Sequence, residues 1–283
     1  MRILIADGID TAAEQSGVTV QAARTLSRLT GASAEWVDWP AAMVGVGGSG
    51  SWVENAAQGL GDLRRRISLD DGGLILISYS GGNRIVHDLL NQAATSGDAA
   101  LLARVRAVGF VSDPWRPRGE FVPDTVDPGG WGLCGEDHGP IPERSVWCAA
   151  EGDAATAAEP DAMLRTAADI GTNMDEKRLR GAFEGVRRHL SEESFQLQGL
   201  YDGNPVRWLR ELFDRGLQLR GDVDRYYGGW HTEHYTRPYA HGHSLVERMC
   251  ARLAELSGEP GNGSEPEAGG EARGISPRTA ASS

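Results

Sequence analysis

The sequence LILISYSGGNRIVHDLL, residues 74–90, changes from one hydrophobic pattern to another at its middle. The continuous apolar run 74–77 is typical of an interior strand of a parallel sheet, and the apolar residues of 85–90 recur at helical spacing. Small residues separate the two parts, and Ser80 stands at the corner. A strand, a tight turn and a helix around a serine form the context of a nucleophile elbow, which exposes the serine hydroxyl above an α/β sheet.

The residues around Ser80 match the elbow pattern G-x-S-x-G at every position except the first. Ser78 stands where the pattern has its first glycine, and serine adopts unusual backbone angles less readily than glycine does. The alternative is that Ser80 only caps the helix that begins at Gly81, a role in which serine is common. Serine helix caps are frequent, whereas a buried strand that ends in SYSGG is uncommon. The uncommon pattern is the more informative of the two, so we favour the elbow.

Length and composition limit the classes of protein to which the chain can belong. The 283 residues are enough for one large domain, or for one domain with an inserted subdomain. A net charge of −12 argues against a nucleic-acid partner. No stretch reaches the length of a membrane span, so we expect no stable membrane insertion. The chain opens with the strand-like RILIA instead of the features of a signal peptide.

The cysteine count is that of a protein made in a reducing cytoplasm. The chain has three cysteines, Cys134, Cys148 and Cys250, which cannot all pair with one another. Sparse cysteines in a chain without a secretion signal are usually free, so we expect free thiols. A Cys134–Cys148 bridge is the alternative.

Strand and helix patterns alternate along the first part of the chain, residues 1–160, which we take as an α/β-hydrolase core. The strands are predicted at 2–6, 34–39, 74–78, 105–112 and 145–150, and the helices at 19–29, 53–67 and 81–92. This alternation predicts a doubly wound parallel sheet with helices on both faces. Ligands bind such sheets at the carboxyl ends of the strands, where Asp7, Ser80, Asp113 and Asp153 fall.

The rest of the chain divides into three parts. Residues 161–222 show only helical patterns, at 175–190 and 205–219, which we interpret as a helical insertion that acts as a lid or linker. Residues 223–256 are expected to return to the core with a short extended piece, a histidine-rich loop and a last helix at 244–256. Residues 257–283 are rich in Gly, Pro, Ser, Glu and Ala without periodicity, which predicts a disordered tail.

A serine at an elbow reacts only if a base takes its proton and an acid orients that base. In α/β-hydrolase folds the order along the chain is serine, acid, histidine. Residues 145–153 suit the acid, because an apolar strand leads through a glycine turn to Asp153. Glu151 is the nearby competitor, and Asp113 follows an earlier strand. Asp153 also suits a simpler role as a turn or helix-cap residue.

The base is expected in the loop 230–243, WHTEHYTRPYAHGH, which contains four of the seven histidines. Clustered histidines also suggest zinc, but no H-E-x-x-H pair stands on a helix, and His231 with His234 lacks a third ligand at a familiar spacing. We therefore expect no metal. His241 and His243 adjoin the last helix and are expected to face solvent. The choice of base lies between His231 and His234 and is close to even.

With these motifs in place, the chain resembles the lysin B esterases of actinobacteriophages. These are cutinase-like α/β hydrolases that cleave the ester between mycolic acids and arabinogalactan. The resemblance spans about residues 2–256. It rests on the Asp7-Gly8 turn, the elbow 78–82, the segment GFVSDPWRPRG at 109–119, the Gly152-Asp153 turn and the histidine loop. The chain departs from the family at Ser78, where the family has glycine, and at Gly81, where it has glutamine. The family also has a tyrosine three residues after the histidine, whereas Tyr235 follows His231 by four and His234 by one.

The resemblance implies roles for particular residues. Ser80 would be the nucleophile, Asp153 the acid, and His231 or His234 the base. The oxyanion of the tetrahedral intermediate needs preorganised donors, for which we expect the backbone N–H groups of Gly81 and of Ile9. A further expectation is that Asp10, Tyr79 and Trp115 bind substrate. The reaction requires no metal and no organic cofactor.

The resemblance also implies a function and a place of action. The chain would be a serine esterase that acts on a lipid ester of the cell envelope during phage lysis. It would be made in the host cytoplasm without a signal peptide and would reach the envelope after release. The alternatives are a cutinase-like or lipase-like hydrolase of other lipid esters, and a non-catalytic virion or cell-wall binding module on the same fold, since a fold alone does not fix a function.

Overall fold

The computed structural model describes residues 1–43, 47–136, 138–159, 229–239 and 242–258. Its centre is a sheet of five strands, with every neighbouring pair parallel, in the order β2-β1-β3-β4-β5. The strands are β1 Arg2–Ala6, β2 Ser33–Trp36, β3 Leu74–Tyr79, β4 Val105–Val111 and β5 Ser145–Cys148. The predicted α/β class with a central parallel sheet is therefore confirmed. The strand order reverses between β1 and β3, and this is where ligands bind in open sheets of this kind.

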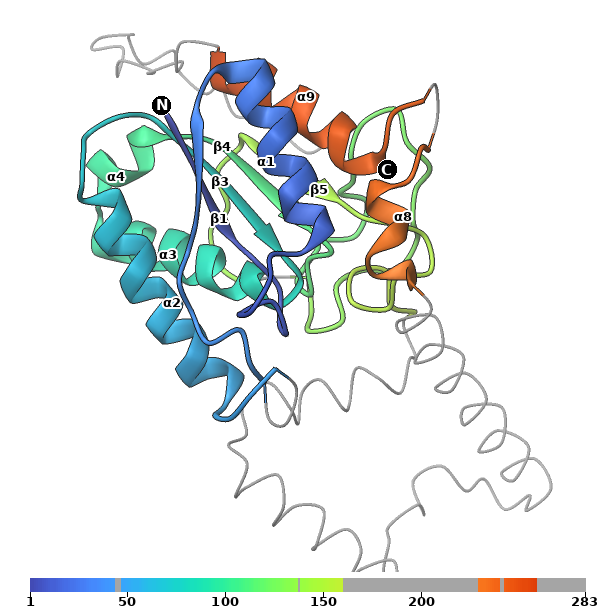
Figure 1. Ribbon diagram of the computed structural model, residues 1–283, viewed down its shortest axis with the longest axis horizontal. Helices are drawn as coiled ribbons and strands as arrows, with labels where there is room; N and C mark the ends of the chain where they lie inside the picture. The colour runs from blue at the N-terminus through green and yellow to red at the C-terminus, as the bar shows by residue number, and fades with distance from the viewer. Residues whose placement is uncertain (44–46, 137, 160–228, 240–241, 259–283) are drawn as a thin grey trace, which may run out of the picture.

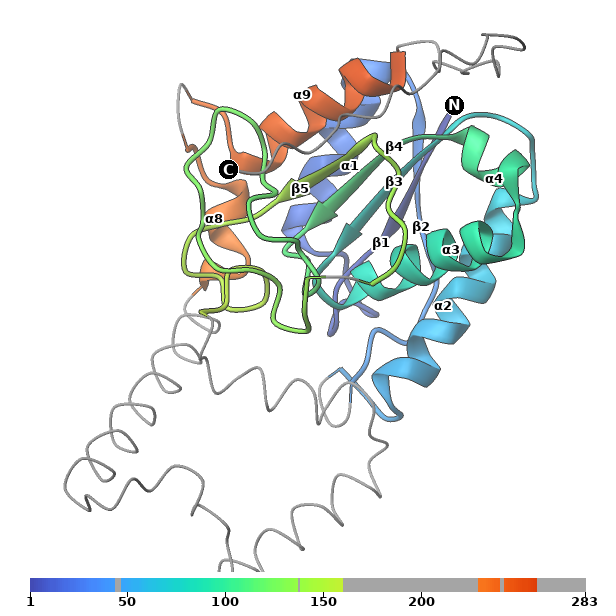
Figure 2. The ribbon, with the colours of Figure 1, turned by 180° about the vertical axis from the view of Figure 1, so that it is seen from behind.

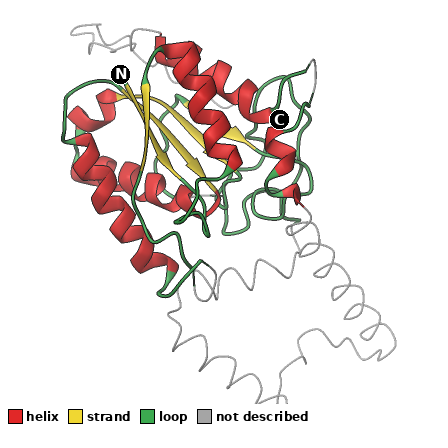
Figure 3. Ribbon diagram, in the orientation of Figure 1, coloured by secondary structure: helices red, strands yellow, loops and turns green. Residues whose placement is uncertain are grey.

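Helices cover both faces of the sheet, as Figures 1 and 2 show from opposite sides. Helices α1 (Gly17–Thr30) and α9 (Leu245–Gly258) pack on one face. Helices α2 (Trp52–Ile67) and α3 (Asn83–Ser96) pack on the other. In Figure 3 the strands form a central layer between these two pairs.

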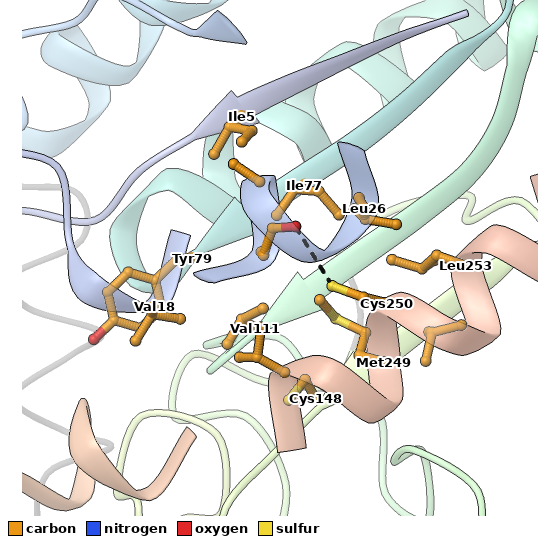
Figure 4. Close-up of a cluster of buried hydrophobic side chains, with 14 of the residues drawn as sticks. Ile5, Val18, Leu26, Ile77, Tyr79, Val111, Cys148, Met249, Cys250 and Leu253 are labelled. Atoms are coloured by element: carbon orange, nitrogen blue, oxygen red, sulfur yellow. Dashed lines mark hydrogen bonds between the residues drawn. The ribbon is translucent and has the colours of Figure 1, made fainter. Parts of the chain in front are cut away.

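Two buried apolar clusters hold the three layers together. Along β1, Ile3 and Ile5 belong to the cluster on the α1 and α9 side, whereas Leu4 belongs to the cluster on the other side. Because successive side chains of a strand point to opposite faces, a strand covered on both faces must be apolar at every position. Figure 4 shows the first cluster, where Ile77 of β3 lies among side chains of α1 and α9.

The predicted helices 19–29, 53–67 and 244–256 are present with bounds shifted by one or two residues, and larger differences occur elsewhere. A short helix, α4 (Ala99–Arg104), was not predicted; it has six residues, and its Leu101 and Leu102 are partly buried against the cluster on the α2 and α3 side, a segment too short to show a helical period. The predicted helix 81–92 begins with a 3₁₀ turn, η1 (Ser80–Gly82), and continues as α3 to Ser96. It ends at Gly97, whose left-handed φ of 71° suits a glycine C-cap.

Several predictions fall outside the described residues. These are the helical insertion 161–222 with its helices at 175–190 and 205–219, the extended piece near 224–227, and nearly all of the tail 257–283. In the part of the chain that the structure does describe, no helix has the length and apolar character that crossing a membrane requires. None of the three cysteines forms a disulfide. Cys148 belongs to the cluster on the α1 and α9 side and Cys134 packs against the other, so the alternative of a bridge between them is wrong.

Candidate active site

Ser80 lies at the tip of a strained turn directly after β3. Its φ of 51° is in the left-handed region, which costs a non-glycine residue about 1–2 kcal/mol. Gly82 allows this turn to press against the end of β1, because a Cβ atom at Gly82 would lie 2.3 Å from the carbonyl oxygen of Asp7. Among the described residues, neither η1 nor α3 begins with a side-chain cap bond, so Ser80 does not act as a helix cap. The turn has the backbone of a nucleophile elbow.

Asn83, on the first turn of α3, braces the elbow. Its side-chain amide donates hydrogen bonds to the carbonyl oxygens of Ser80 at 2.8 Å and of Val111 at 3.0 Å. Its Oδ1 accepts a bond of 2.7 Å from the Ser78 hydroxyl. The hydroxyl that replaces the expected glycine therefore takes part in the brace. Sequence reasoning missed this use of Ser78 and Asn83, since both are ordinary residues for a turn.

His231 connects Ser80 to Asp153 through its two ring nitrogens. Nε2 lies 2.7 Å from Ser80 Oγ, and Nδ1 lies 3.0 Å from Asp153 Oδ1. A carboxylate only accepts hydrogen bonds, so it holds the proton on Nδ1 and leaves Nε2 free to accept the serine hydroxyl proton. The three side chains come from the ends of β3 and β5 and from the loop before α8 (Glu233–Thr236). This is the arrangement that a serine nucleophile and its general base require.

The Asp153 carboxyl is fully buried, yet its pKa lies below the ordinary value. Burial by itself would raise the pKa of this carboxyl. The charge of His231, together with hydrogen bonds from His231, Ser112 and Tyr235, outweighs burial and brings the pKa below its ordinary value. Asp153 is therefore ionised at neutral pH and can stabilise a positively charged His231.

Two hydroxyl groups around Asp153 were missed by the sequence reasoning. Ser112, which follows β4, donates to Asp153 Oδ2 at 2.5 Å, and its Oγ lies 3.1 Å from His231 Nδ1. Tyr235 donates to the same Oδ2 at 2.6 Å. Ser112 is fully buried, whereas Ser80 is 8% exposed, so Ser80 is the serine that a substrate can reach. The position of Ser112 at the carboxyl end of a strand, next to Asp113, was the one available signal.

The two residues expected to supply the oxyanion donors lie side by side at the switch point. A Cβ atom at Gly81 would stand 2.6 Å from Cδ1 of Ile9, so the β1–α1 loop touches the elbow at this position. The indole N–H of Trp52 donates to the Gly81 carbonyl oxygen at 3.0 Å and fixes the orientation of this peptide. The buried Asp7 carboxylate holds the other side, since it accepts bonds from Gly8 N–H at 2.8 Å and from the Ser16 hydroxyl at 2.7 Å.

The expected substrate-binding residues have different positions in the structure. Tyr79 is buried beside the imidazole, and its hydroxyl donates to the His231 carbonyl oxygen at 2.7 Å, so it supports the base from behind. Trp115 is buried and stacks on Trp52, with ring centroids 5.3 Å apart. Asp10 is exposed on the β1–α1 loop, with a φ of 68°. Tyr79 and Trp115 are therefore buried residues that support the site, whereas Asp10 is exposed on the neighbouring loop.

The competing acid and base candidates lie away from the triad. Asp113 is buried on the α3 side, where its Oδ2 meets His87 Nε2 at 3.0 Å and Trp147 Nε1 at 3.0 Å. Glu151 is exposed. His234 packs against Trp230 with ring centroids 4.4 Å apart, and burial, with a smaller effect of Arg237, lowers its pKa.

Of the two remaining histidines of the loop, the structure describes one. His243 is exposed, as expected, and His241 lies outside the described residues. Over the described ranges, no group of three or more His, Cys, Asp or Glu side chains is arranged to hold a metal ion.

Two solved structures share a distant likeness with this chain. One is a cutinase-like protein from Cryptococcus sp., at 18% identity and a TM-score of 0.43, covering 60% of this chain and 87% of that one. The other is the catalytic core domain of acetyl xylan esterase from Trichoderma reesei, also at 18% and 0.43, covering 59% of this chain and 90% of that one. No family model and no curated protein matches the sequence. Similarity at this level does not decide an activity. The class of this protein follows from its own fold and site: an α/β protein with a buried Ser–His–Asp hydrogen-bond network at the carboxyl edge of a parallel sheet.

Proposed function

We propose that this protein is a serine esterase of the lysin B type, which hydrolyses the ester between mycolic acids and arabinogalactan. The observation that carries the esterase chemistry is the unbroken line of hydrogen bonds from Ser80 Oγ through His231 to the ionised Asp153. The finer assignment of substrate rests on the resemblance of the elbow, the 109–119 segment and the Gly152-Asp153 turn to that family. The same proposal has the protein made in the host cytoplasm and acting on the cell envelope after release.

The reaction proceeds by acyl transfer in two steps. His231 Nε2 takes the hydroxyl proton while Ser80 Oγ attacks the ester carbonyl carbon. When the C–O bond of the ester breaks, His231 gives this proton to the departing alkoxide. A water molecule then attacks the acyl-serine, His231 takes its proton, and the carboxylic acid leaves as Ser80 recovers its hydrogen. Asp153 stabilises the imidazolium that forms in both steps.

The negative charge of each tetrahedral intermediate needs donors that are already in place. Backbone N–H groups at the start of a helix meet this need, because they are unpaired within the helix and point along its dipole. We assign this role to the N–H of Gly81, with Ile9 on the adjoining loop as the second donor. Removal of one such donor typically lowers kcat by about 10²- to 10³-fold.

The test compares simple esters with the proposed natural substrate. Hydrolysis of p-nitrophenyl esters of increasing chain length is measured beside the release of fatty acids from purified mycolyl-arabinogalactan. We expect activity on both, and no activity in a folded Ser80→Ala variant. Hydrolysis of the simple esters without release from mycolyl-arabinogalactan would place the protein among cutinase-like or lipase-like hydrolases of other lipid esters.

Labelling by a fluorophosphonate separates an enzyme from a binding module. This probe reacts with a serine hydroxyl only when a neighbouring base activates it. The wild-type protein should be labelled and Ser80→Ala should not. A folded wild-type protein that resists the probe would show that the Ser80–His231 pair is not active, and the non-catalytic virion or cell-wall binding module would replace the esterase.

A further inference from the structure

The Asp153 carboxylate has hydrogen-bond donors on both of its oxygens. Oδ1 faces His231 Nδ1 at 3.0 Å and also accepts from the Ala155 N–H at 3.1 Å. Oδ2 accepts from two hydroxyl groups, those of Ser112 at 2.5 Å and Tyr235 at 2.6 Å. All of these groups are buried, so each bond forms in a region of low dielectric, where hydrogen bonds to charge are strong.

Ser112 also contacts the base directly. Its Oγ lies 3.1 Å from His231 Nδ1, and its single hydrogen is given to Asp153 Oδ2. The lone pairs of Oγ are therefore the part of the hydroxyl that can face the imidazole N–H. His231 is thus joined to the carboxylate along two routes, directly through Oδ1 and through Ser112 to Oδ2.

The backbone at Ser112 is strained in the same way as at the nucleophile. Its φ is 48°, in the left-handed region that a residue with a Cβ rarely adopts. Glycine would adopt this conformation without strain but would bring no hydroxyl. Strained backbone of this kind persists where the surrounding structure requires it, and it gathers at functional sites. Here the strain places Oγ between the acid and the base.

Tyr235 reaches the carboxylate from a different part of the chain than Ser112 does. It lies on α8, four residues after the base, and its hydroxyl also accepts a hydrogen bond of 3.2 Å from the Ala150 N–H, just beyond β5. The ring is fully buried, and burial raises the pKa of its hydroxyl well above the ordinary value, so this group stays protonated and donates. Tyr235 therefore fixes Asp153 relative to the end of the strand that leads to it.

We infer that Ser112 and Tyr235 are positioning residues that hold the Asp153 carboxylate against His231, and that Ser112 gives the imidazolium a second hydrogen-bond acceptor. This inference rests on the proposed esterase function. Neither hydroxyl touches the substrate, so both act through Asp153 and His231. Loss of either one leaves Oδ2 short of a donor in a buried site, and the carboxylate then holds the base less firmly in the geometry that proton transfer requires.

The first measurement is steady-state kinetics on a short-chain p-nitrophenyl ester. Ser112→Ala and Tyr235→Phe should each lower kcat by about 10- to 100-fold, the loss expected when one hydrogen bond to a buried charge is removed, and should leave KM nearly unchanged. Ser112→Gly should lose as much as Ser112→Ala, because both lack Oγ although only glycine relieves the backbone strain. It also serves as the second variant if alanine prevents folding.

Matched controls separate positioning from loss of stability. Ser244 is a buried serine whose hydroxyl accepts the N–H of Glu247 at the start of α9, so Ser244→Ala should lower the melting temperature without changing kcat. Tyr239→Phe removes a hydroxyl that accepts a hydrogen bond of 2.8 Å from the Val126 N–H, and it should also leave kcat unchanged.

The second measurement is a double-mutant cycle. In an Asp153→Asn background the Ser112→Ala change should cost much less than in the wild type, because its effect passes through the carboxylate that is already gone. Equal costs in both backgrounds, or an unchanged kcat in folded Ser112→Ala, Ser112→Gly and Tyr235→Phe, would overturn the inference while Ser80→Ala remained inactive. A folded Ser80→Ala variant that keeps full activity would instead overturn the proposed function.

Discussion

At the scale of single residues, the two histidines of the loop differ by where α8 begins. His231 precedes Glu233, the first residue of the helix, and its ring turns toward Ser80. His234 lies within α8, and its ring turns onto Trp230. Tyr235, the next residue of the helix, faces Asp153. The spacing of histidines in the sequence could not separate the two candidates, because it does not show where a four-residue helix starts.

Separate alanine substitutions at these two histidines should have very different effects. His231→Ala removes the base and should lower kcat by about 10⁴-fold or more, as loss of a catalytic histidine does elsewhere. His234→Ala leaves the Ser80–His231–Asp153 line intact and should change kcat little. Both variants are measured on a short-chain ester after their folding is checked by thermal unfolding. An inactive, folded His234→Ala enzyme beside an active His231→Ala enzyme would contradict the geometry.

The two buried aspartates make a second contrast at this scale. Asp153→Asn should lower kcat by about 10⁴-fold, because an amide facing Nδ1 favours the wrong tautomer of His231. Asp113→Asn should act mainly on stability, since the bond from His87 or that from Trp147 is weakened in a buried site, at a cost of about 1–3 kcal/mol. The comparison needs kcat and the free energy of unfolding for both variants. The reverse pattern would move the acid to the end of β4.

At the scale of elements, the site depends on how closely the elbow approaches β1. Gly82, the last residue of the 3₁₀ turn at Ser80–Gly82, packs against the carbonyl groups of Ala6 and Asp7. Sequence patterns predicted the strand and the helix on either side of this corner, because hydrophobic period reports burial directly. These patterns do not predict how closely the elbow approaches β1, because that distance depends on a contact between the backbone at the end of β1 and the backbone that follows β3.

Gly82→Ala tests this approach. The new Cβ would lie 2.3 Å from the Asp7 carbonyl oxygen and 2.4 Å from that of Ala6, and backbone atoms cannot rotate away as a flexible side chain can. We expect a loss of about 1–3 kcal/mol in the free energy of unfolding and a marked loss of kcat. Gly61→Ala on α2 is the control, because its Cβ meets nothing within 4 Å and should raise stability by about 0.5–1 kcal/mol. Equal stability of the two variants would show that the approach is looser than described.

At the scale of the whole molecule, the features that depend on local sequence pattern could be predicted, whereas those that depend on contacts between distant residues could not. The strands, their parallel pairing and the two covered faces follow from periodicity that a short window contains. The elbow and the acid turn were also found, because each carries its own local motif. Ser112 and Tyr235 were missed because a serine after a strand and a tyrosine in a loop look ordinary. Their importance comes from lying within hydrogen-bond distance of Asp153, which is 41 residues from Ser112 and 82 from Tyr235.

Buried protonated groups make the stability of the whole fold sensitive to alkaline pH. Burial raises the pKa values of Cys148, Cys250 and Tyr235 above their ordinary values of 9.0, 9.0 and 10.0. Cys250 lies between α9 and α1, where its thiol points to the Ala22 carbonyl oxygen at 3.7 Å (Figure 4). A raised pKa in the folded state means that the folded protein holds its proton more tightly than the unfolded chain does.

The stability contributed by these groups is fully present below pH 9 and is lost as the pH rises above it. Each group that is protonated in the folded protein and deprotonated in the unfolded chain adds a slope of about 1.4 kcal/mol per pH unit to the fall in the free energy of unfolding. Urea unfolding between pH 7 and 11 measures this fall. Cys250→Ala should show a shallower fall above pH 9 than the wild type. Parallel curves for the two proteins would mean that the Cys250 thiol titrates alike in the folded and unfolded chain.

The packing of α9 against α1 also has a consequence during translation, because α9 must be made before it can cover this face of the sheet. The apolar face that α9 covers is built from β1, α1, β3 and β4, all of which are translated long before residue 258. At the usual 5–20 residues per second, about 10–35 seconds separate Ser80 from the end of α9. During that interval the nascent chain carries an uncovered apolar sheet face, the kind of surface that chaperones bind. Ser80 meets His231 only after a further 151 residues have been translated, so until then the hydroxyl has no base.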